Sequence, residues 1–474
     1  PPADPPRRWP MALGVAIAGV AVVGLVAFLT QLMGDDGPGH PDEWDARAVD
    51  LAAFVEDERG LQFDHPVYVD FLTDAEYTEE TTSDEAEVLP DERAELDRYA
   101  GELRALGVAA GEIDLFDVLN RVSDGGTLAF YDPTDQRVRV RGTEMTVGLE
   151  VTLVHELTHA LQDQHFDLER LQDSQLDDGA STAFRGLAEG DALRIEDAYV
   201  EKELTTVEQA TYEEEYAGEI TESEAATEGV PPFVSATFSA PYALGQPFVL
   251  MLTNRDGNSG VDDAFEEPPS TEEHLFDPAS FLDEDTAERS IDLGFEEGAD
   301  LLDEGPFGAT SWYLFLAERI DPKVAFEAAL GWNGDAFAAT DDDGAVCVRI
   351  AFVGDTEDDE DEMTAALELW TAALPGGGAD IEQVDGRPVL VSCDPGEDVD
   401  LELTGRSENS LYLPNLWGYL IADGASVLDV AGSRCYARTV IDGLTFEEIT
   451  DPEGEAFAGD AFQGVLTDAF EACS

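Results

Sequence analysis

"HELTHALQDQHF", residues 155–166, contains three of the six histidines in the chain. His155 and His159 stand four positions apart, so a helix would place both imidazoles on one face. Glu156 lies beside them and completes the HExxH pattern of zinc sites. The pattern predicts a Zn²⁺ ion held by the two histidines, with Glu156 as the catalytic base next to it.

The segment around the motif predicts an unbroken, mostly buried helix over residues 143–166, with Thr143 as its N-cap. His165 matches the HExxHxxGxxH spacing of metzincins, which would make it a third ligand. Gln162, however, replaces the glycine at which that pattern breaks the helix. In a continuous helix, His165 would lie about 9 Å along the axis from His159. We therefore expect His165 to stay outside the site.

Glu189 is the favoured third ligand. It follows His159 by 30 positions, in a second predicted helix over residues 180–204, and small residues flank it. Small side chains allow two helices to approach closely enough for a carboxylate to reach across. Asp191 and Glu196 remain alternatives on the same helix.

These residues resemble the gluzincin branch of the zincin metallopeptidases, in which a downstream glutamate follows the HExxH motif. The wider pattern is similar to a poorly characterised set of bacterial and archaeal HExxH proteins, and the resemblance covers residues 44–335. Besides the motif itself, it is carried by "PYALGQPF" (241–248), "AFEEPPSTEEHLFDP" (264–278) and "GWNGD" (331–335). Many gluzincins carry an acid four positions after the glutamate ligand, to orient a histidine. Here that position is Leu193, so the partner of the histidine is unassigned.

The resemblance implies a zinc metallopeptidase that hydrolyses a peptide or protein substrate. Glu156 would take a proton from the zinc-activated water and pass it to the leaving amine. Tyr242 and His274 are the candidate donors to the oxyanion, and each also has a structural interpretation. Residues 138–141 are expected to form an edge strand that pairs with an extended substrate. The alternative function is a catalytically inactive zincin scaffold that acts as a surface binding or envelope-structure protein.

Composition limits the class of protein and of partner. The chain has 106 acidic and 24 basic residues, a net charge of −82, and only two lysines, Lys202 and Lys323. An acidic, lysine-poor chain with 43% hydrophobic residues is typical of adaptation to molar salt, where charge repulsion is screened. Nucleic acid is excluded as a partner, because no basic stripe is present to neutralise phosphates.

An uncharged stretch over residues 11–34 is long enough to cross a bilayer. Arg7 and Arg8 precede it, so the positive-inside rule puts residues 1–10 in the cytoplasm and the remainder outside the cell. We therefore expect a single-pass membrane protein with an extracellular catalytic domain. A cleaved signal peptide is the alternative.

The fold class expected from these patterns is α+β. A zincin-like domain over residues 41–335, mostly helical with a small edge-strand sheet, should follow the transmembrane helix, and a small α+β domain should occupy residues 345–474. All four cysteines fall in this last part. In an oxidising exterior they are expected to form two disulfides, with the pairing left open among Cys347, Cys393, Cys435 and Cys473.

Overall fold

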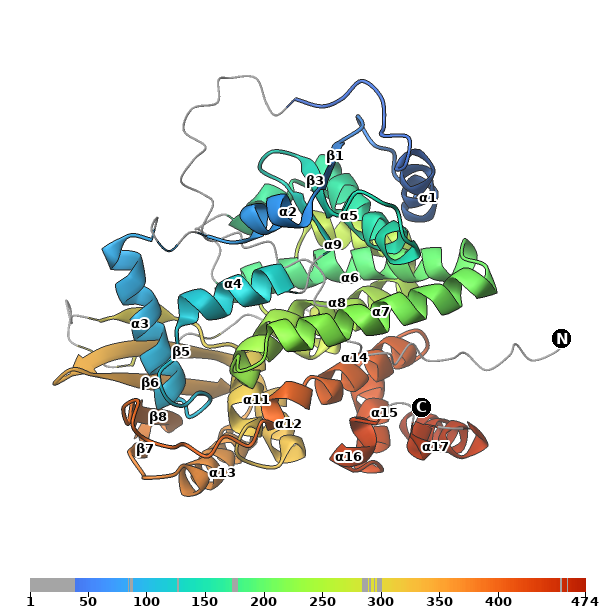
Figure 1. Cartoon of the computed structure of the whole chain (residues 1–474). Coiled ribbons are helices and arrows are strands. Elements are labelled where there is room, and N and C mark those ends of the chain that lie inside the picture. The colour runs from blue at the N-terminus through green and yellow to red at the C-terminus, as the bar shows by residue number, and fades with distance from the viewer. Residues whose placement is uncertain are drawn as a thin grey trace.

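The computed structural model describes residues 39–83, 85, 88–125, 128–172, 178–283, 289, 291–293, 295, 301–451, 454–457 and 459–474. Within them the chain is mixed α+β, with helices in the middle layer and a small sheet above it (Figure 1). The helices of the first half are α1 (Val49–Arg59), α2 (Asp74–Thr81), α3 (Pro90–Ala105), α4 (Leu115–Gly125), α5 (Val147–Phe166), α6 (Asp178–Lys202), α7 (Thr206–Ala226) and α8 (Pro232–Asp256). Those of the second half are α9 (Asn258–Glu266), α10 (Glu273–Phe276), α11 (Ala309–Ala317), α12 (Pro322–Leu330), α13 (Glu357–Ala373), α14 (Tyr412–Gly424), α15 (Val430–Asp442), α16 (Phe446–Ile449) and α17 (Gly459–Cys473).

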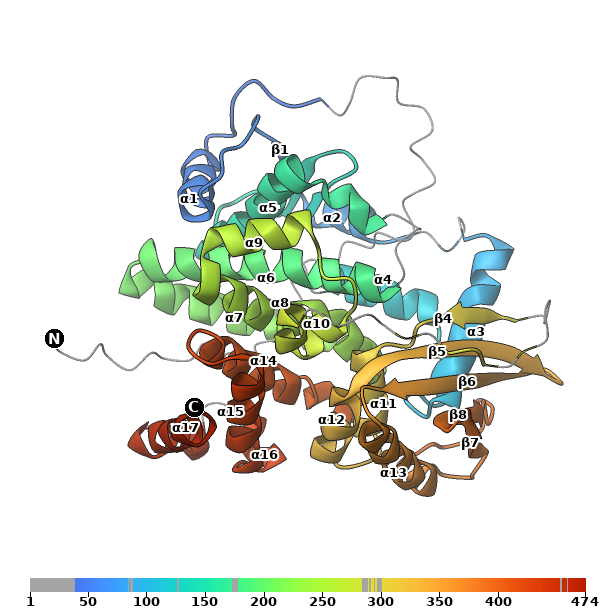
Figure 2. The same ribbon diagram turned by 180° about the vertical axis from the view of Figure 1, so that it is seen from behind.

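The described strands form two sheets. The small sheet has the order β1-β3-β2, and the larger sheet has the order β4-β5-β6-β8-β7. Figure 2 shows the larger sheet at the opposite end of the molecule from β1, with α3 and α13 beside it. The strands are β1 (Tyr68–Leu72), β2 (Ala129–Asp132), β3 (Arg137–Arg141), β4 (Asp303–Gly305), β5 (Trp332–Asp342), β6 (Ala345–Gly354), β7 (Ala379–Val384) and β8 (Arg387–Cys393).

The edge-strand prediction for residues 138–141 is wrong, because β3 is the central strand of the small sheet. It pairs in parallel with β1 and antiparallel with β2, so both of its edges are used. Val138 and Val140, on one face of β3, are fully buried. The alternating arginines that suggested a wet edge instead form ion pairs with acidic neighbours: Arg137 with Asp70, Arg139 with Asp135, and Arg141 with Asp124.

Close contact between α6 and α8 explains the small residues of the "PYALGQPF" stretch. A Cβ atom on Gly245 would lie 1.9 Å from the carbonyl oxygen of Gly186, and one on Gly190 would lie 2.2 Å from the carbonyl oxygen of Gly245. The two backbones therefore touch at a crossing that only glycine permits. This crossing lies one residue from Glu189 on α6 and fixes the position of that helix.

The larger sheet joins the two halves of the chain. The boundary expected between residues 335 and 345 falls within the β5–β6 hairpin, and buried residues from both sides of it share one hydrophobic core. Asp335, the last residue of "GWNGD", is buried there, and its carboxylate accepts hydrogen bonds from the backbone N–H groups of Phe307 and Gly308 and from two indoles. The "GWNGD" motif therefore has a structural role at the start of α11.

The prediction of two disulfides is confirmed, and the structure gives their pairing. Cys347 on β6 bonds Cys393 at the opposite position of β8. Cys435 on α15 bonds Cys473 at the end of α17. Both crosslinks lie far along the chain from the HExxH helix and join neighbouring elements of the last third.

The expected fold class needs one correction, which concerns the membrane. Among the residues that the structure describes, no helix is both long and apolar enough to span a bilayer. The transmembrane helix expected over residues 11–34 lies outside the described residues. The fold class of the described residues is mixed α+β.

Candidate metal centre

The helix α5 carries the HExxH motif and runs without a break to Phe166. It begins at Val147 rather than near Thr143, because the Thr146 side chain accepts the N–H of Leu149 and caps the helix. Since the helix continues past Gln162, His165 lies beyond the site, and its Nε2 is 2.8 Å from the carbonyl oxygen of Gln62.

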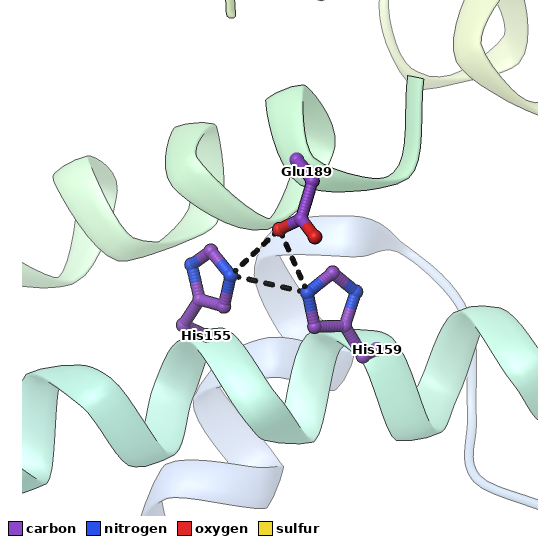
Figure 3. A group of neighbouring side chains, drawn as sticks. All are labelled: His155, His159 and Glu189. Carbon is purple, nitrogen blue, oxygen red and sulfur yellow. Dashed lines mark hydrogen bonds and ion pairs between the residues drawn. The ribbon is translucent and has the colours of Figure 1, made fainter. Parts of the chain in front are cut away.

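Three side chains from α5 and α6 converge on one point (Figure 3). His155 Nε2 lies 3.1 Å from His159 Nε2, and each of these nitrogens lies 3.2 Å from Oε2 of Glu189. His155 and Glu189 are buried, and His159 is only slightly exposed. These three residues form the one group of potential metal ligands found among the described residues.

The triangle has the size of a tetrahedral zinc site. Ligand atoms placed about 2.0–2.1 Å from zinc at tetrahedral angles are about 3.3 Å apart. The distances of 3.1–3.2 Å between the three donor atoms are close to that value. The arrangement can therefore hold a metal ion and leave a fourth position open.

Glu196 fixes the orientation of His155. Its Oε2 lies 3.0 Å from Nδ1 of the imidazole, and its other oxygen accepts the hydroxyl of Tyr212 at 3.2 Å. A carboxylate can only accept, so Nδ1 of His155 carries the proton and Nε2 keeps its lone pair for a metal. Glu196, an alternative ligand in the sequence analysis, lies outside the ligand triangle and orients His155 instead, from a position one helical turn after Leu193.

Gln162 fixes the orientation of His159. Its Nε2 donates to the carbonyl oxygen of Ala188 at 3.1 Å and to Oδ2 of Asp191 at 3.0 Å, so the amide nitrogen is identified by its acceptors. The amide oxygen consequently faces Nδ1 of His159, at 3.0 Å, and must accept its proton. His159 therefore also presents an unprotonated Nε2. The sequence marked Gln162 only as the residue that replaces a glycine and gave no sign of this contact.

In their neutral form, the two imidazoles therefore aim lone pairs at each other and at a carboxylate oxygen. Such an arrangement is repulsive unless a positive charge lies among the three atoms, either a metal ion or a proton on one imidazole. The pKa directions of the ligand residues also favour a positive charge at this point. Burial alone would raise the pKa of Glu189, but His159 and His155 outweigh burial and hold the pKa well below its usual range. Burial opposes a charge on His155, but Glu189 and Glu196 raise its pKa well above normal. The centre thus favours a positive charge.

Glu156 lies beside the triangle and does not belong to it. Its Oε2 accepts the backbone N–H of Tyr131 on β2 at 2.7 Å, and the Tyr131 hydroxyl bonds Asp163 at 2.7 Å, so β2 is tied to α5 at two points. Burial raises the pKa of Glu156 to about 7, although His155 and His159 oppose the rise. A carboxyl with a pKa near neutrality suits transfer of a proton in both directions.

Of the two candidate oxyanion donors, the structure brings Tyr242 to the centre. Burial raises the pKa of Tyr242 well above normal, and its hydrogen bond to Glu189 adds to this rise. His274, on α10, stacks edge-on against Phe281 with ring centroids 5.3 Å apart, and burial lowers its pKa to about 4. Asp191, weighed as a ligand, is engaged in ion pairs with Arg59 and Arg194.

Comparison with protein families, curated proteins and solved structures gave no match for this chain.

Proposed function

We propose that the protein is a zinc-dependent metallopeptidase. The observation that carries this proposal is the convergence of two imidazole lone pairs and the Glu189 carboxylate on one buried point, with the proton positions of His155 and His159 set by Glu196 and Gln162. Two neutral imidazoles and one carboxylate, with a fourth position open, are the ligand set of catalytic zinc.

The roles of the residues follow from their positions. His155, His159 and Glu189 would bind Zn²⁺, which supplies a Lewis acid that activates water and polarises a carbonyl group. Glu156, next to the ligands but bonded to β2, is placed to take a proton from the attacking water and deliver it to the leaving amine. Tyr242, which hydrogen-bonds Glu189, would donate a hydrogen bond to the developing oxyanion.

Among the described residues, β2 is an outer strand of the small sheet, and it lies next to the proposed catalytic base. Because Arg141 N–H donates to the carbonyl oxygen of Leu128, the alternate residues Ala129 and Tyr131 direct their backbone groups away from β3. The Tyr131 N–H reaches Glu156, so this edge borders the catalytic base. Ala129 and Tyr131 are buried in the structure, so the choice of a peptide as the substrate rests on the metal centre and its catalytic base.

Comparison of Glu156→Gln with Glu150→Gln tests the proposal. Both glutamates lie on α5, but only Glu156 contacts the centre. The full-length chain, purified in molar salt, is assayed for zinc content and for hydrolysis of a broad peptide library. Glu156→Gln should keep its zinc and lose about 100-fold or more of the activity, whereas Glu150→Gln should keep both. A zinc-loaded wild type that cleaves nothing would instead support the inactive scaffold.

A further inference from the structure

A buried chain of hydrogen bonds leads from α1 to the ligand His159. Arg59 Nε lies 2.7 Å from Oδ2 of Asp191, and both side chains are fully buried. The same oxygen accepts Nε2 of Gln162 at 3.0 Å, and the Gln162 oxygen lies 3.0 Å from His159 Nδ1. Arg59 is 132 positions from Asp191 in the sequence, so the chain links distant segments.

We infer that Asp191 is a positioning residue for the metal ligand His159 and that it acts through the amide of Gln162. This inference rests on the proposed metal centre and adds to it the groups that select the metal-binding form of His159. Neither Asp191 nor Arg59 contacts a ligand atom; their effect passes through the one amide between them and the imidazole.

The two ends of an amide differ, because the oxygen accepts a hydrogen bond and the NH₂ group donates one. A glutamine beside a histidine can present either oxygen or nitrogen, and only the oxygen leaves Nε2 of the histidine free to bind a metal. Asp191 and the Ala188 carbonyl are both acceptors, so they retain the nitrogen of Gln162 and direct its oxygen to His159. Rotation of the amide would bring oxygen against oxygen at these two contacts.

The charge of Asp191 is itself secured. Arg59 Nε lies 2.7 Å from Oδ2 of Asp191, and Arg194 Nη2 lies 2.7 Å from its Oδ1, so both carboxylate oxygens are in ion pairs. Arg59 is in turn shared with Asp262, which lies 2.7 Å from its Nη1 and is one-third exposed. A buried ion pair contributes little to stability compared with apolar residues of the same volume, but it does fix orientation. Asp262 therefore offers a control: it supports Arg59 without contacting Gln162.

The test measures zinc affinity of the full-length chain, together with the visible absorption of the Co²⁺-substituted protein, which reports ligand geometry. Gln162→Met removes the acceptor of His159 while leaving the ion pairs of Arg59 in place. It should weaken zinc binding about 10–100-fold and alter the Co²⁺ spectrum. Gln164→Met, on the same helix but bonded to the segment at His65, should change neither.

Asp191→Asn is then compared in the wild-type and Gln162→Met backgrounds. If Asp191 acts through Gln162, the substitution weakens zinc binding in the wild type and adds almost nothing to Gln162→Met. Asp262→Asn should leave zinc affinity unchanged even where it lowers stability. Equal losses in both backgrounds, or wild-type affinity and spectrum in Gln162→Met, would overturn the inference while leaving the metal centre intact. If Asp191→Asn does not fold, the zinc affinity and the Co²⁺ spectrum of Gln162→Met test the inference alone. A wild type that binds neither Zn²⁺ nor Co²⁺ would overturn the proposed function as well.

Discussion

Glu196 Oε2 lies 3.0 Å from Nδ1 of His155, and this contact fixes which imidazole nitrogen faces Glu189. Glu196 stands seven positions after Glu189 on α6, so the same helix supplies the third ligand and the carboxylate that orients the first. Because its second oxygen accepts the hydroxyl of Tyr212 on α7, Glu196 also connects the centre to the helix that follows.

Glu196→Leu should weaken zinc binding about 10–100-fold, since His155 would lose the acceptor for its Nδ1 proton. Glu196→Gln should lose less, because an amide oxygen still accepts. Glu201→Gln, an exposed site on the same helix, is the control. Zinc affinity measured by competition with a chelator reports the difference. Equal affinity in Glu196→Leu and the wild type would remove Glu196 from this role.

Glu189→Ala should lose zinc and peptide hydrolysis together, because two imidazoles alone bind zinc poorly. His165→Ala should keep both, since α5 is unbroken and His165 points to Gln62. Metal analysis of the two purified variants distinguishes the sites. Loss of zinc in His165→Ala with retention in Glu189→Ala would mean that α5 breaks near Gln162.

Gly245→Ala should destabilise the fold by about 1–3 kcal/mol or more, because the new methyl group would meet the carbonyl oxygen of Gly186 at 1.9 Å. Forcing α8 away from α6 should also weaken zinc binding through the shift of Glu189. Gly218→Ala is the matched control: it lies within α7 in open space and should stabilise the chain by up to about 1 kcal/mol. Denaturant titration in molar salt gives both values. A Gly245→Ala protein as stable as the wild type would show that the helices can separate at little cost.

Two carboxyls that are not metal ligands, the buried Glu102 and the partly buried Glu219, predict an unusual pH dependence. Burial and the neighbouring Asp303 raise the pKa of Glu102 from 4.5 to about 7, and burial and Glu215 do the same for Glu219. Between pH 4.5 and about 7 the folded chain binds more protons than the unfolded chain. These groups therefore stabilise the fold at low pH, and this stabilisation is lost as the pH rises through about 7. Replacing Glu102 and Glu219 by glutamine should therefore flatten the stability of the chain between about pH 5 and 7.5. An unchanged slope would show that both groups titrate normally.

Low salt should unfold the chain. The net charge of −82 makes carboxylate repulsion strong once screening weakens, so stability should fall progressively below about 1 M salt. Circular dichroism during dilution from molar salt follows the transition. Full stability in dilute buffer would contradict the interpretation of the charge as halophilic adaptation.

The sequence could indicate the ligands because their information is local. Spacing on one helix places His155 and His159 together, and small residues around Glu189 signal a close helix crossing. Gln162 and Glu196 could not be assigned in this way, since their partners depend on how α5 and α6 are rotated against each other. The prediction that β3 is an edge strand failed for a similar reason. The alternation in β3 indicates one polar face, and the sequence does not show that Asp70, Asp124 and Asp135 pair with its arginines. These ion pairs make the polar face compatible with a central strand.

The most direct test of the central claim is the zinc content of the full-length wild-type chain, purified in molar salt without added chelator. The triangle formed by His155, His159 and Glu189 predicts about one zinc ion per folded chain. Less than about a tenth of an equivalent, with no uptake when Zn²⁺ is added to the folded protein, would contradict the account.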